Sequence, residues 1–152
     1  MAERLTPKVL RSLVGKELGV SEWFTITQDR IHAFAESTED RQWIHVDEEK
    51  AREGPLHGTV AHGFLILSLL PHFLQQIPLF NLRFRMAVHY GLNRVRFVHP
   101  VKPGNRIRNR AVLKDFSRKG FFRVLLTIEN TIEIEDESKP ALVAELLGMI
   151  FL

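Results

Sequence analysis

Long stretches in the second half of the chain alternate apolar and polar residues, and this period-two pattern predicts β-strands. Between residues 84 and 92 the apolar side chains stand at even positions, whereas Val95 and Phe97 stand at odd positions. The apolar face therefore changes sides, which requires an inserted residue or a sharp twist. We predict either a β-bulge between Gly91 and Arg94 or a general curvature of the sheet there.

Three more strands complete the predicted sheet. Pro103 and Gly104 suit the second and third positions of a tight turn that precedes one strand. Residues 122–134 carry apolar side chains at most even positions, which predicts a strand with one buried face. A turn is predicted at 136–140, and residues 141–152 form the last strand.

The first half of the chain has helical patterns instead. Residues 6–14 are typical of a short helix, with Thr6 as its N-cap and Pro7 at its first position. Residues 15–19 are predicted to form a turn, and residues 20–26 an extended segment.

Thr27 is the predicted N-cap of a second helix. Ile31, Phe34 and Ala35 recur at helical spacing and form its buried stripe. His32 falls outside this stripe, so we expect it to be exposed.

The most apolar segment, residues 61–77, predicts a core helix. Pro71 conflicts with this prediction, because a proline inside a helix removes one hydrogen bond at a cost of ~3 kcal/mol. We expect a bend there, with Pro78 ending the helix. A shorter helix over 48–53, capped by Asp47, precedes it. Helices followed by an antiparallel meander indicate an α+β fold.

Composition narrows the class of protein. The 152 residues, 45% hydrophobic and 26% charged, suit one domain over 1–152 with residues 1–19 as an N-terminal helical extension. The absence of cysteine fits a reducing cytoplasm. Residues 1–18 lack the apolar core of a signal peptide, and the longest apolar run is far shorter than the ~20 residues that span a membrane. We expect a soluble protein with no membrane partner.

Asp40 and His45 are the first candidate catalytic pair. Within one helix a spacing of five would direct them apart, but an irregular turn can direct both side chains at one point. An aspartate near a histidine is also common by chance, so this pair alone indicates little.

Gly63 stands where the core helix begins. The first turn of a helix has free N–H groups and a partial positive charge, and a glycine there lets a carbonyl approach the backbone closely. This arrangement can serve as an oxyanion hole. Alternatively, Gly54, Gly58 and Gly63 are simply turn residues.

At these residues the sequence resembles the MaoC-like (R)-specific enoyl-CoA hydratases. The resemblance rests on Asp40, His45, Ala51, the Ala-His-Gly of 61–63 with its apolar helix, and the turn at 100–105. It implies a hot-dog fold, in which a long helix is wrapped by an antiparallel sheet.

By the same resemblance Asp40 and His45 are the catalytic pair of a hydro-lyase, and the Gly63 N–H is the oxyanion donor. It further implies a homodimer that acts on an acyl-CoA thioester, with coenzyme A as part of the substrate and no separate cofactor. His62, beside the helix start, is expected to orient the loop by hydrogen bonding. The further candidates for substrate contact are Ser68, Tyr90 and Asn93.

One departure concerns the residues between the pair. The family commonly has Asn-Pro where this chain has Gln42-Trp43, a version typical of a nodulation-protein-like subgroup. The acid–base pair is intact, whereas the acyl-chain preference is open.

Four alternatives remain from the sequence. A metal site is one, with Asp40, His45, Asp47, His57 and His62 as possible ligands, but their spacing matches no zinc motif, so no metal is expected. A thioesterase or a non-catalytic acyl-binding module is compatible with the same fold. The chain has a net charge of +3, and basic residues alternate along one predicted strand. These residues can attract the phosphates of coenzyme A or simply be solvated. Nucleic-acid binding through them is the alternative that ranks last. These basic residues are Arg106, Arg108 and Arg110.

Overall fold

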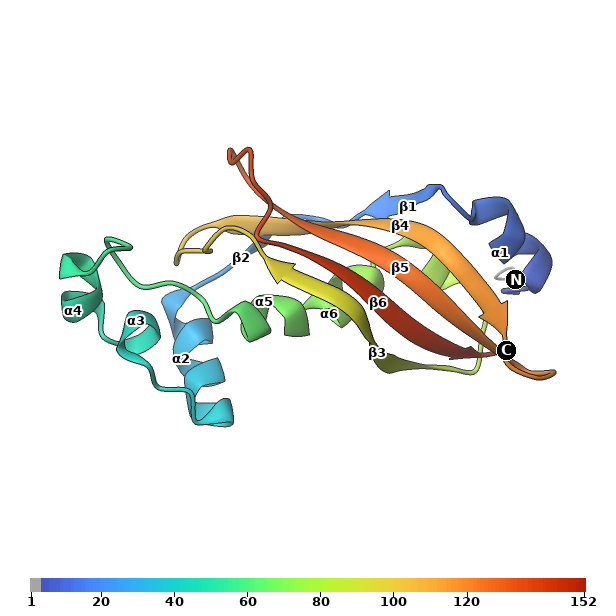
Figure 1. Ribbon diagram of the computed structural model, residues 1–152, viewed down its shortest axis with the longest axis horizontal. Helices are drawn as coiled ribbons and strands as arrows, with labels where there is room; N and C mark the ends of the chain where they lie inside the picture. Colours follow the sequence, from blue (N-terminus) through green and yellow to red (C-terminus); the bar gives the residue numbers. More distant parts are fainter. Residues whose placement is uncertain (1–3) are drawn as a thin grey trace.

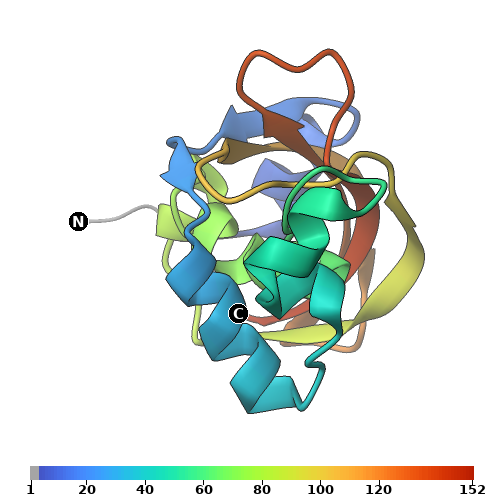
Figure 2. The same ribbon diagram turned by 90° about the vertical axis from the view of Figure 1, so that its left-hand side faces the viewer.

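The computed structural model describes residues 4–152 and contains one antiparallel sheet in the order β1-β4-β5-β6-β3, with β2 also paired to β4. The sheet curves around two short helices, α5 (Gly63–Ser68) and α6 (Leu70–Leu74) (Figures 1 and 2). This is the expected hot-dog architecture. The strands are β1 Glu17–Val20, β2 Phe24–Thr25, β3 Met86–Phe97, β4 Arg106–Arg118, β5 Arg123–Ile134 and β6 Leu142–Phe151.

The helices fall into three groups along the chain. One lies near the N-terminus, three precede the central pair, and a short 3₁₀ turn follows that pair (Figure 1). Among the described residues, no helix is both long enough and apolar enough to cross a membrane. The helices are α1 Pro7–Leu13, α2 Gln28–Thr38, α3 Trp43–Val46, α4 Glu48–Glu53, α5 Gly63–Ser68, α6 Leu70–Leu74 and η1 Pro78–Asn81.

The predicted core helix is present but divided. Leu69 separates α5 from α6, and Pro71 lies in the first turn of α6, where its missing N–H is tolerated. The bend at Pro71 is confirmed, but one helix over 61–77 is wrong, because a proline at that position cannot continue the ladder of α5. Pro78 both ends the segment and begins η1.

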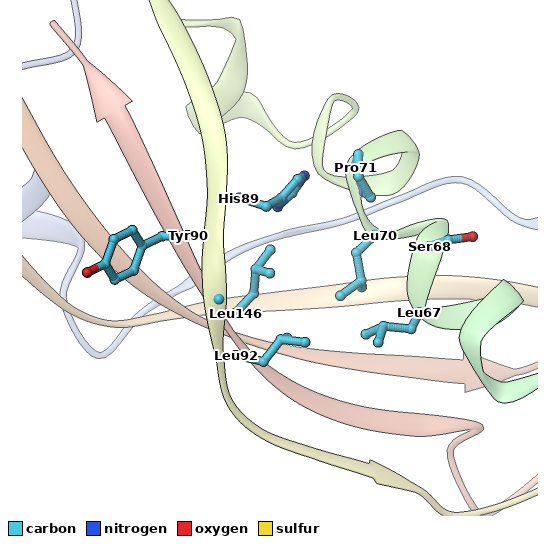
Figure 3. Close-up of a pocket in the computed structure, with 9 residues that line it drawn as sticks. Leu67, Ser68, Leu70, Pro71, His89, Tyr90, Leu92 and Leu146 are labelled. Atoms are coloured by element: carbon cyan, nitrogen blue, oxygen red, sulfur yellow. The ribbon is translucent and has the colours of Figure 1, made fainter.

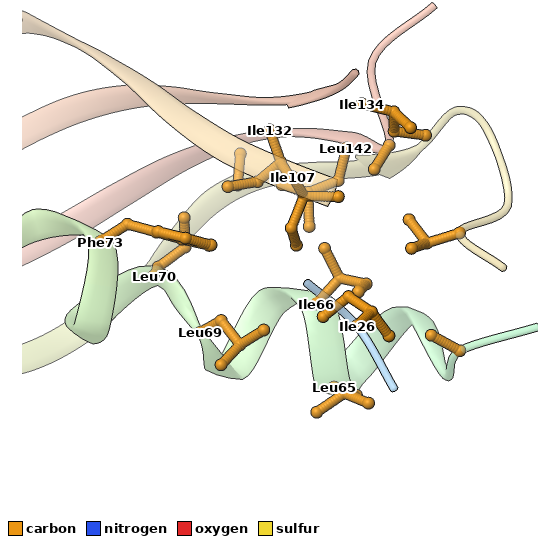
Figure 4. Close-up of a cluster of buried hydrophobic side chains, with 14 of the residues drawn as sticks. Ile26, Leu65, Ile66, Leu69, Leu70, Phe73, Ile107, Ile132, Ile134 and Leu142 are labelled. Atoms are coloured by element: carbon orange, nitrogen blue, oxygen red, sulfur yellow. The ribbon is translucent and has the colours of Figure 1, made fainter. Parts of the chain in front are cut away.

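The core lies between α5–α6 and the concave face of the sheet (Figure 4). Leu65, Ile66, Leu70 and Phe73 project from the helices and are almost completely buried. Each fully buried side chain of this size contributes about 1.5–3 kcal/mol. On the sheet side they meet Ile107, Ile132, Ile134 and Leu142.

The strand predictions hold where one face is buried. Even positions of β5 from Val124 to Ile134 are buried, as predicted, although Phe122 before the strand is exposed. In β3 the register shifts between His89 and Gly91 and again between Leu92 and Arg94, which confirms the predicted irregularity near Gly91.

Two predictions for the first strands are wrong. Residues 17–19 belong to β1 rather than to a turn, because the free edge of β4 accepts them as a pairing strand. Residues 20–26 are not one extended strand, because the Glu22 N–H turns away from β4 and donates to Gln76 Oε1 at 2.9 Å. The extended segment is therefore split into the end of β1 and the short β2.

Predicted caps are confirmed at the helices of the first half. Side-chain oxygens of Thr6, Thr27 and Asp47 accept hydrogen bonds from backbone N–H groups three residues later. The expectation that His32 is exposed is wrong. The side chain is half-buried, because its ring approaches Gln28 and the carbonyl of Val46. These caps set where α2 and α4 begin, and so position the loop between them.

Candidate active site

The site lies at the end of the molecule formed by α2, α3 and α4, which connect β2 to α5 (Figure 1). Helix α2 ends at Thr38, and its C-cap Glu39 takes a left-handed backbone conformation (φ 62°) that directs the chain into a loop. Asp40 stands in this loop and is exposed. The single turn of α3 then places His45 inward, and Gln28 Nε2 donates to the His45 carbonyl at 2.8 Å.

His45 is buried, with 7% of its surface exposed. Its Nδ1 lies 2.6 Å from the carbonyl oxygen of Val60. Because a carbonyl can only accept, Nδ1 carries the proton in this pair, and the neutral ring keeps its lone pair on Nε2. Burial lowers the pKa of His45 below the ordinary histidine value, and His62 lowers it further, against the opposing influence of the Val60 carbonyl and Asp40. The ring is therefore neutral at neutral pH.

His62 links the two members of the pair. Its Nε2 donates to the backbone carbonyl of Asp40 at 2.9 Å, and its ring stacks on His45 with centroids 3.7 Å apart. Only 2% of His62 is exposed, and its buried Nδ1 finds no hydrogen-bond partner within the described chain. The expectation that His62 orients the loop by hydrogen bonding agrees with this geometry.

The structure brings Asp40, His45 and His62 together, since one nitrogen or oxygen from each lies within 4.8 Å of the others. The two candidate catalytic side chains thus lie close together, although Asp40 belongs to a loop and His45 to α3. The same three groups are a possible metal cluster. Their geometry does not suit one, because an imidazole nitrogen binds a metal in the plane of its ring, and two rings with centroids 3.7 Å apart and planes inclined by only 23° do not direct their nitrogens at one nearby point.

Gly63 is the first residue of α5 and directly follows His62. A Cβ atom at this position would lie 2.8 Å from Cδ1 of Phe97, so a side chain cannot be added without displacing that ring. The close approach explains the glycine more specifically than a turn does. Beside it lies a cavity of about 210 Å³ whose lining includes Ala61, Gly63, Ile66 and Phe97.

The remaining candidates lie further along the molecule. Ser68 and Tyr90 line a second cavity of about 300 Å³ between the central helices and β3 (Figure 3). The Tyr90 ring points away from that space, and the Ser68 hydroxyl donates to the Leu65 carbonyl at 2.7 Å. Asn93 donates to Glu145 on the neighbouring strand. None of these three joins the Asp40 cluster.

Two residues near the site were not found from the sequence. Phe97 covers Gly63, and Gln28 holds the α3 carbonyl from another helix. Both act across long sequence separations, and no local pattern marks either one.

The basic strand face is neutralised. Arg106 pairs with Glu135, Arg108 with Glu133, and Arg110 with Glu133 and Glu17. Burial raises the pKa of Glu133, but Arg110 and Arg108 outweigh this and leave it below the usual value. These ion pairs favour a structural role over attraction of phosphates.

Comparisons with known proteins identify the family of this chain. Residues 9–136 match the family described as MaoC like domain. The chain is 43% identical to 3-hydroxyacyl-thioester dehydratase Z of Mycobacterium tuberculosis, over 90% of this chain and 89% of that protein. It is 46% identical to nodulation protein N of Rhizobium leguminosarum bv. viciae, over 91% and 87%.

A solved structure shows the same fold. The R-hydratase of Pseudomonas aeruginosa superimposes with a TM-score of 0.71 and 20% identity, covering 90% of this chain and 81% of that one. The family match covers most of the chain, and the relatives align over nearly their full length. The chain belongs to the MaoC-like domain family.

Proposed function

We propose that this protein is an (R)-specific enoyl-CoA hydratase or 3-hydroxyacyl-CoA dehydratase, a hydro-lyase acting on acyl thioesters. The observation that carries the proposal is that polar atoms of Asp40 and His45 lie within 4.8 Å of each other and of His62, which directly precedes the first residue of α5. Family membership and the 43% identical dehydratase support the reaction class.

In the hydration direction one water molecule is held between Asp40 and His45. His45 accepts a proton on Nε2, since its Nδ1 is committed to Val60 and the ring is neutral. The water oxygen attacks the β-carbon of a trans-2-enoyl thioester, while the Asp40 carboxylate accepts a hydrogen bond from the O–H that stays in the product. The proton then passes to the α-carbon, directly from His45 or through Asp40. Dehydration reverses these steps through the same transition state.

His62 acts as a positioning residue in this proposal. It holds the Asp40 backbone and packs against the His45 ring, so it fixes the distance between acid and base. Its ring also stays stacked against the His45 ring throughout the proposed reaction. Its proposed role is thus indirect, and contact with the substrate is not required.

Gly63 supplies its N–H to the thioester oxygen as negative charge develops there. Phe97 forms the wall of the adjoining cavity, and Ser68 and Tyr90 line the second one. We assign the acyl thioester to this region, with Asn93 as an outer candidate. Coenzyme A enters as part of the substrate, and the proposed reaction needs no further cofactor and no metal.

The proposed assembly is a homodimer formed through the free edge of β3. This strand ends the sheet order and exposes a row of large apolar side chains. An unpaired apolar strand edge is a template for pairing with another strand. These side chains are Met86, Val88, Tyr90 and Leu92. We place the reaction in the cytoplasm, and no nucleic acid takes part.

The test is crotonyl-CoA turnover. Loss of the enoyl absorbance without release of free thiol supports a hydratase, whereas thiol release supports the alternative, a hot-dog thioesterase. Asp40→Asn is expected to lower kcat/KM by about a hundredfold to ten-thousandfold. It should leave binding of a saturated acyl-CoA nearly unchanged. Unchanged turnover in this variant would contradict the proposal, and binding without turnover in the unmodified protein would favour a non-catalytic acyl-binding module.

A further inference from the structure

The turn between β4 and β5, residues 118–123, exposes two adjacent aromatic rings; we call it the hairpin tip. Phe121 is 86% exposed and Phe122 is 71% exposed, more than any other large apolar side chain in the described residues. In Figure 1 this turn projects at the right-hand end of the molecule, beyond the C-terminus and opposite to α2–α4. Exposed apolar groups that adjoin one another mark an interaction surface more often than isolated ones do.

The hairpin tip is also basic. Arg118, Lys119 and Arg123 are exposed, and within residues 4–152 none of them forms an ion pair. The other end of the same strand differs, because its three arginines are all paired with glutamates. From Phe116 to Ile128 the sequence contains no acidic residue. The positive charge at the tip is therefore available to an anionic partner.

The tip has a defined conformation. Lys119 N–H donates to the Arg123 carbonyl at 2.8 Å, Gly120 takes the left-handed conformation (φ 78°), and Leu152 N–H donates to the Phe122 carbonyl. The backbone thus holds both rings outward. β6 separates β5 from β3, so the proposed dimer edge lies on another part of the sheet.

We propose that the hairpin tip docks on an anionic lipid surface, with Phe121 and Phe122 inserting among the headgroups and the three cations contacting lipid phosphates. Aromatic rings flanked by Lys and Arg are the usual composition of such peripheral contacts. A projecting tip offers no groove for a partner's side chain, whereas a bilayer surface deforms around it. Helix α1 lies at the same end and adds exposed Lys8 and Arg11 (Figure 1).

This contact is peripheral and independent of the proposed reaction. It revises the expectation of no membrane partner, which rested on the lack of a spanning segment. Surface docking needs no such segment.

The experiment is co-sedimentation of the full chain with phosphatidylcholine vesicles, prepared with and without phosphatidylserine. We expect binding only to the anionic vesicles, weakening as salt rises. Phe121→Ser/Phe122→Ser is expected to lower the partition coefficient about tenfold or more, and Lys119→Glu at least about fivefold. Phe64→Ser and Lys102→Glu are the matched controls, since they remove an equally exposed ring and an exposed cation elsewhere.

Thermal unfolding of each variant checks that the fold is intact, and light scattering measures its mass. The proposal is overturned if anionic vesicles do not retain the protein at low salt, or if the double variant binds as well as the unmodified chain. A changed mass of the double variant without any effect on vesicles would assign the tip to contact between copies. Retention on immobilised polyglutamate but not on vesicles would assign it to an acidic protein instead.

Discussion

The cluster of Asp40, His45 and His62 and the outer face of β4–β5 both contain charged and polar side chains, but the hydrogen bonds of these side chains go to different kinds of partner. On the outer face Arg108 and Glu133 pair side chain to side chain, so each neutralises the other. In the cluster His45 and His62 each donate to a backbone carbonyl. A backbone anchor uses one nitrogen of each ring and leaves the other uncommitted. Histidines held by backbone carbonyls therefore keep a nitrogen free for a ligand, whereas the paired side chains of the outer face do not.

The largest effect in this comparison is expected at Gly63, whose backbone N–H is the proposed oxyanion donor. Gly63→Ala places a Cβ atom 2.8 Å from the Phe97 ring, so the start of α5 or the ring must move. We expect kcat to fall about a hundredfold, as when an oxyanion donor is lost. The free energy of unfolding should fall by about 1–3 kcal/mol through overpacking. Enzyme kinetics and denaturant unfolding measure the two effects.

Two variants control for this substitution. Gly148→Ala adds a methyl group where nothing lies within 4 Å, so it should change neither quantity much. Gly63→Ala combined with Phe97→Ala removes the obstructing ring and should recover part of the lost activity. Equal losses in the Gly63 and Gly148 variants would show that the close approach to Phe97 is not what matters.

Two substitutions at His62 distinguish its hydrogen bond to the Asp40 carbonyl from its stacking on the His45 ring. His62→Phe keeps a ring against His45 but loses the hydrogen bond to Asp40, and we expect kcat to fall about tenfold with KM little changed. His62→Gln keeps an N–H donor near the same carbonyl and should retain more activity than the Phe variant. His72→Gln, on α6 and away from the cluster, is the control for replacing a histidine. Equal activity of the two His62 variants would contradict the positioning role.

The lowered pKa of His45 predicts how stability and activity depend on pH. Because burial lowers this pKa in the folded protein, the unfolded chain binds the proton more readily, and stability rises with pH up to about the ordinary value of 6.5. The acid limb of kcat/KM should accordingly lie below about 6.5. His62→Phe removes a group that lowers the pKa of His45 and should move that limb upward. A limb at or above the ordinary value in the unmodified enzyme would contradict a neutral buried base.

The smallest effect is expected on the outer face. Arg106→Ala removes a half-exposed ion pair with Glu135, and exposed pairs contribute about 0–1 kcal/mol. Activity and its dependence on salt should stay unchanged. A marked rise in KM for crotonyl-CoA would instead show that this arginine contacts the coenzyme A phosphates.

Prediction from the sequence succeeded where the cause is local. The caps at Thr6 and Thr27 involve residues three positions apart, and the bend at Pro71 follows from one missing N–H. It failed for residues 17–26, where the outcome depends on which N–H groups reach the edge of β4 and which reach Gln76. No period in a short segment records such a competition.

The strands with one buried face, the helix starts capped by Thr6, Thr27 and Asp47, and the family resemblance at Asp40 and His45 could be read from the amino-acid sequence alone, because each is encoded in neighbouring residues or in a motif. The tertiary structure alone decided that His62 stacks on His45 and that Phe97 covers Gly63. Those contacts join residues that lie 17 and 34 positions apart in the chain, so no local pattern in the sequence encodes them.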